Sequence, residues 1–292
     1  MFPAQGFLLV ELHVQDLEYV YHQGTPLEVK ALHGVSFFLP QGEVLGILGG
    51  TGSGKTTLIK NLNGLLRPTS GHVLIDGIDS HACGPGLRRR IGLVFQRPER
   101  QLFEETVYRD ISFVLRRFTA LKETQIRDRV ATACNLVGLD MGDVADRSPL
   151  ALSDGEKRKA AIAGILVNEP EIVVLDEPAV GLDPPAIADL IRFIEEIKAS
   201  RKRSVILVSH DMERFLGVMD RLLVLNNGTA VAWGSPADVC RDLAADRQMR
   251  ALLPGLALLV HDLQEAGCPL EPRGYRVADL VDQILRLPGG PN

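Results

Sequence analysis

The stretch Gly49-Gly50-Thr51-Gly52-Ser53-Gly54-Lys55-Thr56 has the residue types and the spacing that hold phosphate groups. It fits the pattern G-x-x-x-x-G-K-[ST], follows the apolar run Val44–Leu48 and opens an expected helix over Lys55–Leu65. Small residues let backbone N–H groups curl around phosphate oxygens at the positive end of a helix dipole. The stretch, together with Thr57, is therefore the predicted nucleotide contact. A glycine-rich turn that only joins a strand to a helix explains this context less well.

Two carboxylates follow a second apolar run, Ile172–Leu175. The ends of buried strands are where α/β sheets place ligand-contacting residues. We expect Asp176 to hold Mg²⁺, directly or through water, and Glu177 to polarise the attacking water as general base. Lys55 would reach the outer phosphates and the Thr56 hydroxyl would ligate the ion. Such a pair in isolation is more often a solvated acidic turn, but beside the phosphate loop it favours Mg²⁺-dependent ATP hydrolysis.

A histidine ends another apolar run. His210 follows Val205–Ser209 directly, so it could approach the terminal phosphate of a bound nucleotide. A lone histidine is more often structural than catalytic, and this alternative stays open from the residue alone. The remaining histidines show no metal-ligand spacing and are expected at the surface or in packing; they are His13, His22, His33, His72, His81 and His261.

Bulk composition narrows the class of protein. The chain has 292 residues, a formal net charge of −5 and an isoelectric point near 5.8, so nucleic acid is disfavoured as a partner. Its four cysteines form no CxxC pair, which fits a reducing compartment better than a disulfide framework; they are Cys83, Cys134, Cys240 and Cys268. Met1–Gln5 shows no secretory pattern. The most apolar late segment, Ala251–Val260, contains Pro254 and Gly255 and is shorter than the ~20 residues a membrane span needs.

The elements that must position these residues follow from hydrophobic periodicity. Short runs that are apolar throughout predict a parallel sheet buried on both faces; they are Val44–Leu48, Ile91–Phe95, Ile172–Leu175, Val205–Ser209 and Leu222–Leu225. Mixed or alternating runs between turn signals predict an antiparallel layer beside it; they are Leu8–Tyr21, Gly34–Leu39 and His72–Ile75. The sequence therefore predicts two β layers.

Helical patterns predict an inserted subdomain and a tail. From Thr106 to about Leu139 two apolar stripes recur at helical spacing; they are Val107, Ile111, Val114, Leu115 and Phe118, and Ile126, Val130, Cys134 and Val137. Gly234-Ser235-Pro236 marks a break, after which the pattern of Ala237–Asn292 predicts further helices. This tail is expected to form a separate C-terminal element.

A further motif brings in a family. Leu152-Ser153-Asp154-Gly155-Glu156 precedes Leu175-Asp176-Glu177-Pro178 by the spacing between signature and Walker B strand in ABC ATPases, which the chain resembles over roughly Leu8–Pro236. The resemblance implies an α/β P-loop NTPase with a RecA-like parallel-sheet core, an antiparallel β subdomain, an inserted helical subdomain and a C-terminal helical extension. The expected domains are 1–235, with the helical subdomain at about 97–155, and 236–292.

The resemblance also implies roles for single residues. Gln96 is similar to the Q-loop residue that senses Mg²⁺ and the transmembrane partner, Gly181-Leu182-Asp183 to the D-loop, and His210 to the switch histidine. Tyr21 resembles the aromatic residue on which adenine stacks, with Tyr19 as the alternative; either could instead be a strand core residue. The signature residues Ser153, Gly155 and Glu156, with Asp183, are expected to complete the nucleotide site of a partner chain.

Three stretches are most similar to the energy-coupling-factor branch of this family, which includes cobalt and nickel transporter ATPases: Phe95–Val107, Ala161–Leu166 and Gly181–Pro184. Tyr21–Glu28 resembles the strand connection of one of the two ATPase paralogues in that branch. The resemblance implies an ATP-hydrolysing subunit of an importer for a vitamin or transition-metal ion. It would lie peripherally on the cytoplasmic face of the cell membrane.

The partners implied are a second ATPase subunit, either a sister chain or a copy of itself, a transmembrane T component and a substrate-binding membrane subunit. The C-terminal tail would help to hold the ATPase pair together. A non-transport ABC ATPase of translation or DNA repair is the alternative, but such proteins generally need two cassettes in one chain or a long heptad insertion. An adenylate-kinase-like or GTPase fold is disfavoured by the signature.

One residue departs from the family pattern. The usual signature is Leu-Ser-Gly-Gly-Gln, and this chain has Asp154 at the first glycine and Glu156, an accepted variant, at the glutamine. A carboxylate at a helix N-terminus is favourable, but it would repel a nearby triphosphate. We hypothesise that the site completed by this signature is the weaker of two, while Lys55, Glu177 and His210 equip the chain's own site for turnover. The alternative is that Asp154 points away from the nucleotide.

Overall fold

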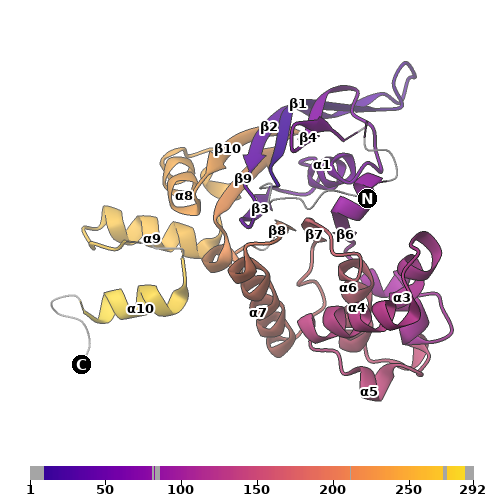
Figure 1. Cartoon of the computed structure of the whole chain (residues 1–292). Coiled ribbons are helices and arrows are strands. Elements are labelled where there is room, and N and C mark those ends of the chain that lie inside the picture. The colour runs from indigo at the N-terminus through magenta and orange to yellow at the C-terminus, as the bar shows by residue number, and fades with distance from the viewer. Residues whose placement is uncertain (1–9, 81, 83–85, 211, 272–274, 287–292) are drawn as a thin grey trace.

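The computed structural model describes residues 10–80, 82, 86–210, 212–271 and 275–286. The expected strand start at Leu8, together with His81 and Cys83, lies outside these residues. Figure 1 shows a β-rich upper part, a helical lobe at lower right and three tail helices at left.

A six-stranded sheet forms the centre of the molecule, in the order β10-β9-β3-β8-β7-β6. The last five strands of this order, from β9 to β6, pair in parallel, and the first, β10 at the edge, runs antiparallel to β9. The strands are β3 (Val44–Leu48), β6 (Ile91–Val94), β7 (Ile172–Asp176), β8 (Ser204–Val208), β9 (Arg221–Asn226) and β10 (Thr229–Gly234). The five expected strands are confirmed, and β10 was not expected because its residues are only partly buried.

Both faces of this sheet are buried, as its continuous apolar strands predict. Ile172 and Val174 of β7 point into a core shared with the antiparallel layer and α1 (Lys55–Leu62). Val173 and Leu175 point to the opposite face, into a core shared with the helical lobe, α7 (Pro184–Ser200) and the tail. The strand ends are therefore held from both sides.

The antiparallel layer is a second sheet in the order β2-β1-β4-β5. Its strands are β1 (Leu12–Tyr21), β2 (Val29–Leu39), β4 (Ser70–Ile75) and β5 (Ile78–Asp79). The expected layer is confirmed, although β2 begins at Val29 and not at Gly34. Its first residues are exposed and pair with the end of β1, so burial gave no signal there.

The helical lobe contains α3 (Val107–Phe118), α4 (Glu123–Leu136), α5 (Met141–Val144) and α6 (Asp154–Leu166). A short helix, α2 (Leu87–Arg90), leads into β6. The expected stripe of α3 is buried at Val107, Ile111 and Leu115. Its last member was predicted wrongly: Phe118 is 55% exposed, because it is the last residue of the helix and the buried stripe ends before it.

The tail forms α8 (Pro236–Ala245), α9 (Gly255–Glu265) and α10 (Val277–Leu285). Ser235 caps α8 by accepting a hydrogen bond from the backbone N–H of Asp238, and Pro236 occupies the first helical turn, so the expected break is a helix start. Val239 and Leu243 of α8 join the core beneath the sheet. The tail is thus packed on the main body through its first helix.

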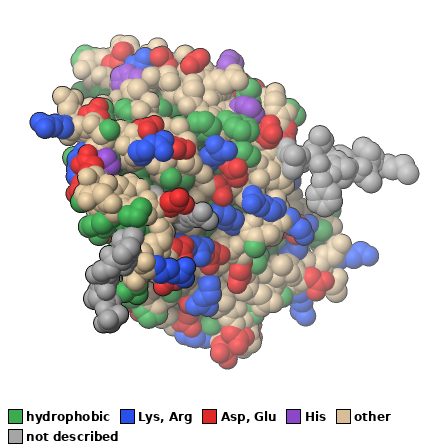
Figure 2. Space-filling view, turned by 90° about the vertical axis from the view of Figure 1, so that its left-hand side faces the viewer, with side chains coloured by type: hydrophobic (Ala, Val, Ile, Leu, Met, Phe, Trp, Pro, Cys, Tyr) green, Lys and Arg blue, Asp and Glu red, His purple; other side chains and the backbone are tan. Residues whose placement is uncertain are grey.

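Apolar side chains remain exposed on the other side of α9 and α10; they are Leu259, Val277, Val281, Ile284 and Leu285. On the face seen in Figure 2, basic and acidic side chains are intermingled, with small apolar areas between them. Within the described residues, no helix combines the length and apolar character that crossing a membrane requires.

Candidate functional site

Four neighbouring parallel strands bring the predicted site residues to one edge of the sheet. The strands β3, β8, β7 and β6 run in the same direction, so their carboxyl ends lie side by side. Gly49 follows β3, His210 follows β8 after Ser209, Asp176 ends β7, and Gln96 follows β6. This edge is where open α/β sheets bind ligands.

The glycine-rich loop is shaped by positions that exclude a side chain. A Cβ at Gly49 would lie 2.3 Å from the carbonyl oxygen of Leu225 and 2.5 Å from Ser53 Oγ. Gly54, the N-cap of α1, has φ 100°, a left-handed conformation that glycine adopts readily. The Ser53 hydroxyl is buried and has no hydrogen-bond partner. Backbone and an unpaired hydroxyl therefore line a cradle of the kind that accepts phosphate oxygens.

Lys55 lies across this cradle. Its Nζ donates hydrogen bonds to the carbonyl oxygens of Gly49 at 2.6 Å and Gly50 at 2.9 Å. Burial lowers the pKa of Lys55, and the negative charges of Glu177 and Asp176 oppose that effect. A cation held by neutral carbonyls can exchange those bonds for stronger, charge-assisted bonds to phosphate. The loop thus presents a lysine that an anionic ligand would engage.

The carboxyl of Asp176 is buried, and nearby positive charges offset only part of the cost of ionising it. Burial, and secondly the charge of Glu177, raise the pKa of Asp176 from 3.8 to about 6, although Lys55 and Lys60 act in the other direction. A divalent cation would relieve this unfavourable charge. Among the described residues no cluster of three or more His, Cys, Asp or Glu side chains could hold a metal. Carboxylate, hydroxyl and phosphate oxygens together are the ligands that Mg²⁺ prefers, so Asp176 and Thr56 fit an ion shared with a nucleotide.

Glu177 is held by the end of β8. Its carboxylate accepts hydrogen bonds from Ser209 Oγ and from the backbone N–H of His210, each at 3.0 Å. His210 Nδ1 lies 2.9 Å from Glu177 Oε2, within hydrogen-bond distance. The backbone of Glu177 has φ 49°, which is uncommon for a residue other than glycine. The predicted base and the predicted histidine therefore contact each other directly.

The two tyrosines considered for adenine stacking differ in their surroundings. Tyr19 packs against the buried core of the antiparallel layer, whereas the Tyr21 hydroxyl lies 3.1 Å from Thr57 Oγ1 on α1. Their rings meet edge to face with centroids 4.7 Å apart. Tyr21 is thus the one tied to the helix that follows the phosphate loop, and its stacking role stays a prediction.

The signature residues form the start of α6. Ser153 Oγ accepts a hydrogen bond from the backbone N–H of Glu156 at 3.3 Å, and Glu156 Oε2 accepts from the Ser153 backbone N–H at 2.8 Å. These reciprocal bonds form a capping box. The hydrogen bonds that the backbone N–H and the hydroxyl of Ser153 donate to the Glu156 carboxylate lower the pKa of Glu156. Gly155 is exposed, and the Asp154 side chain is 98% exposed with Lys157 Nζ at 3.6 Å.

Asp183 caps the N-terminus of α7. Its Oδ1 accepts a hydrogen bond from the backbone N–H of Ala186 at 2.9 Å and so caps the helix. Asp183 and the signature line a groove of about 610 Å³ together with Gln96. No residue of the phosphate loop lines this groove. The predicted residues therefore fall into two sets, one at the sheet edge and one around the groove, and Gln96 adjoins both.

Two residues were missed by sequence reasoning. Ser209 bonds the Glu177 carboxylate, and its position just before His210 at the end of an apolar strand was a signal that could have found it. Arg158 of α6 donates hydrogen bonds to the carbonyl oxygens of Val180 and Gln96. No sequence signal could have identified its role, because both of its acceptors are backbone atoms.

Fold and site together define a P-loop nucleotide-binding protein: a parallel sheet delivers a phosphate loop, a buried aspartate and a glutamate–histidine pair to one edge. The family profile described as ABC transporter matches residues 32–180. The chain is 39% identical to the energy-coupling factor transporter ATP-binding protein EcfA2 of Caldanaerobacter subterraneus subsp. tengcongensis, covering 94% of this chain and 96% of that protein. It is 42% identical to EcfA2 of Acetivibrio thermocellus, with 95% of each chain covered.

Solved structures of ATP-binding cassette proteins share the fold of this chain. The structure of cbiO1 from Clostridium perfringens, described as part of the ABC transporter complex cbiONQ, is 36% identical, with TM-score 0.71, covering 85% of this chain and 98% of that chain. A dimeric ATP-binding cassette, MJ0796 bound to ADP and Pi, shares the fold, with TM-score 0.68 and 24% identity over 77% of this chain and 98% of that one. The chain belongs to the energy-coupling factor transporter ATP-binding proteins of the ABC transporter family. It is accordingly an ATP-binding subunit and an ATPase that drives transport.

Proposed function

We propose that this chain energises the import of a vitamin or a transition-metal ion, using Mg²⁺-dependent ATP hydrolysis on the cytoplasmic face of the cell membrane. The observation that carries this proposal is the convergence of Lys55, Asp176, Glu177 and His210 on one sheet edge. Glu177 takes a proton from the attacking water, and His210, bonded to it, orients that carboxylate. Asp176 and Thr56 hold Mg²⁺, which neutralises charge on the phosphates when bound.

The hydrolysis site is shared between two chains. Lys55 and Glu177 supply one half, and Ser153, Gly155 and Glu156 of α6 supply the other half to a second ATPase subunit. Two features support this: no residue of the phosphate loop lines the groove beside the signature, and both sets include residues exposed to solvent, Thr51 and Thr56 in the phosphate loop and Ser153 and Gly155 in the signature. Asp183 and Gln96 line the groove beside the signature and so adjoin the partner's half.

Exposed apolar residues support contacts with other subunits. Phe103, which is 66% exposed, stacks edge to face on Phe113 of α3, in the segment that follows Gln96. This aromatic pair suits the transmembrane T component, whose position Gln96 would sense. The exposed apolar side of α9 and α10 suits the second ATPase subunit. A separate substrate-binding membrane subunit selects the vitamin or metal ion.

One experiment tests the proposal as a whole. The chain is purified with its co-expressed ATPase and membrane subunits, reconstituted in vesicles, and assayed for ATP-dependent accumulation of labelled vitamins, Ni²⁺ and Co²⁺. We expect accumulation of one of these compounds, its loss with Glu177→Gln, and its loss when Mg²⁺ is chelated. ATP hydrolysis without accumulation of any tested vitamin or metal would refute the substrate class while leaving the ATPase assignment intact.

A further inference from the structure

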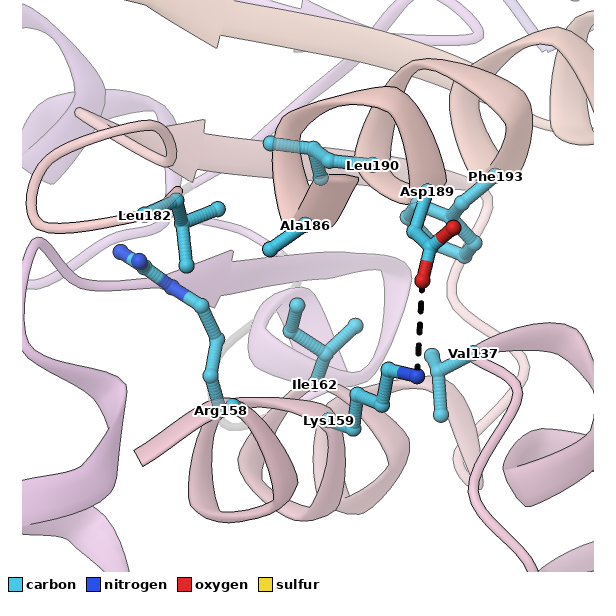
Figure 3. A pocket seen from close by; sticks show the side chains of 10 residues that line it. Val137, Arg158, Lys159, Ile162, Leu182, Ala186, Asp189, Leu190 and Phe193 are labelled. Carbon is cyan, nitrogen blue, oxygen red and sulfur yellow. Dashed lines mark ion pairs between the residues drawn. The ribbon is translucent and has the colours of Figure 1, made fainter. Parts of the chain in front are cut away.

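One arginine joins three segments around the groove. Arg158 lies on α6 shortly after the signature; its Nη1 donates to the carbonyl oxygen of Val180 at 3.0 Å and its Nη2 to that of Gln96 at 3.4 Å. Figure 3 shows its side chain extending from α6 toward the loop that carries Leu182. A single guanidinium thus connects the signature helix, the segment after β6 and the loop between β7 and α7.

The arrangement requires the shape of arginine. A guanidinium offers several N–H donors in a rigid planar fork, so it can bridge two carbonyl oxygens that face it from different segments. A lysine ammonium is a point charge on a flexible stem and would hold one carbonyl at a time. Burial lowers the pKa of Arg158, against the charge of Glu99. The charge is thus kept in a partly desolvated position where its two acceptors are neutral carbonyls.

The neighbouring cation on α6 contacts a different element. Lys159 Nζ lies 3.7 Å from Asp189 Oδ2 of α7, and it donates to the carbonyl oxygen of Gly138 at 3.1 Å. Figure 3 shows this ion pair across a cavity between α6 and α7, with Ile162 below it and Leu190 above. The cavity has a volume of about 60 Å³. Apolar packing is therefore incomplete along this seam, and polar contacts contribute to the placement of α6.

We propose that Arg158 is a positioning residue that keeps Gln96 and the Asp183 loop in register with the signature helix, so that one movement of α6 carries all three. The inference rests on the proposed two-chain hydrolysis site. Lys55 and Tyr21, which would bind the chain's own ATP, lie outside these contacts. The hydrogen bonds from Arg158 to the carbonyl oxygens of Val180 and Gln96 form a bridge. Loss of this bridge therefore lowers the rate of ATP hydrolysis in the assembled complex more than it weakens the binding of ATP.

The test compares two arginine-to-lysine changes in the assembled complex of this chain with its sister ATPase and membrane subunits. Arg158→Lys removes the bridge and keeps the charge. Arg192→Lys makes the same chemical change on α7, where the arginine side chain is 69% exposed and pairs with Asp189. We expect Arg158→Lys to lower kcat about tenfold or more with KM for ATP within about threefold, and Arg192→Lys to change neither beyond about twofold.

Chemical rescue separates positioning from general stability. In Arg158→Ala, methylguanidinium can occupy the vacated fork site, whereas methylammonium offers no fork. We expect methylguanidinium alone to raise kcat. Equal effects of the two reagents, or a kcat of Arg158→Lys within twofold of the parent, would overturn the inference. So would a kcat that falls only in proportion to the folded fraction, measured by circular dichroism.

The outcome for Arg158 can be told apart from the outcome for the two-chain site. ATP-dependent association of the ATPase subunits is measured with Glu177→Gln, which slows hydrolysis, and with Glu177→Gln combined with Arg158→Lys. Absence of association in both proteins means that the two-chain site is wrong. Equal association in both, with kcat of Arg158→Lys unchanged, means that only the role of Arg158 is wrong.

Discussion

The edge of the six-stranded sheet and the start of α6 hold their polar residues in different ways. Asp176 is at the end of a strand that is buried on both faces, and the residue is only 7% exposed. Asp154 is the first residue of α6, and its side chain is 98% exposed. Burial therefore holds Asp176 in place at an electrostatic cost, while local hydrogen bonds hold Ser153 and Glu156 at the start of α6.

This contrast separates the residues that carry out the reaction from those that complete the binding site of a partner. A carboxyl with a raised pKa, a lysine with a lowered pKa and a glutamate bonded to a histidine are typical of a reacting centre. A capped helix N-terminus with an exposed surface is typical of a binding contact that awaits a ligand. If this assignment is right, substitutions at the sheet edge should abolish ATP hydrolysis or change the free energy of unfolding strongly. Substitutions at the start of α6 should change both quantities by smaller amounts.

The largest effect is expected at Glu177. Glu177→Gln keeps the size of the side chain and removes the general base, so we expect kcat for ATP hydrolysis to fall by a factor of about 100 to 10,000. Binding of ATP, measured by fluorescence with a labelled analogue, should stay within about threefold. Glu196→Gln, an exposed glutamate on α7 away from the sheet edge, is the matched control. A Glu177→Gln subunit that hydrolyses ATP at more than a tenth of the parent rate would contradict this role.

The second effect concerns stability and pH at Asp176. A rise in the pKa of a carboxyl from 3.8 to about 6 means that its ionisation costs the folded state about 3 kcal/mol. The folded protein binds this proton more readily than the unfolded chain. The free energy of unfolding therefore falls as pH rises through this range and stays lower above it.

Asp176→Asn should accordingly abolish hydrolysis and yet raise the free energy of unfolding of the nucleotide-free protein by about 3 kcal/mol at pH 8. The gain should shrink to about half at pH 5, where the parent is largely protonated. Urea unfolding in EDTA measures both values. Asp128→Asn, at an exposed position on α4, should change stability by less than about 0.5 kcal/mol at either pH. If Asp176→Asn were no more stable than the parent at pH 8, the folded protein would already offset the cost of the buried negative charge, which would contradict this prediction.

The sequence predicted features that are set by burial better than features that are set by local contacts. The strand ends were predictable because five apolar runs indicated the parallel strands, and three of these runs are followed directly by a predicted polar site residue, Gln96, Asp176 or His210. The end of α3 at Phe118 and the edge strand β10 were not, since neither is set by burial that periodicity can detect. The contacts of Arg158 were not predictable either, because its partners are backbone carbonyls that a pattern of side chains does not encode. The spacing Ser153-x-x-Glu156, in contrast, is the signature of a capping box and could have predicted the capping role of Glu156.

A third, smaller effect is expected from the charge of Asp154. If its carboxylate faces the triphosphate of a partner, Asp154→Gly and Asp154→Asn should both raise ATP hydrolysis of the assembled complex, by about threefold to tenfold. The asparagine variant keeps the size of the side chain, so agreement between the two variants assigns the effect to charge. The gain should diminish at high salt, which screens an exposed charge. Unchanged hydrolysis in both variants would favour the alternative that Asp154 points away from the nucleotide.

The smallest effect is expected at the helix cap. Ser153→Ala removes the side chain that accepts from the Glu156 N–H, which should cost about 1 kcal/mol. Ser235→Ala makes the same change at the cap of α8, where Ser235 Oγ accepts from the Asp238 N–H at 3.2 Å, and should cost a similar amount. Stability alone therefore cannot distinguish the two serines, but nucleotide-driven association can. Because only Ser153 belongs to the half site offered to the partner, Ser153→Ala should weaken ATP-dependent association while Ser235→Ala leaves it unchanged. Equal association in both variants would mean that Ser153 serves α6 alone and that the backbone of the signature makes the contact.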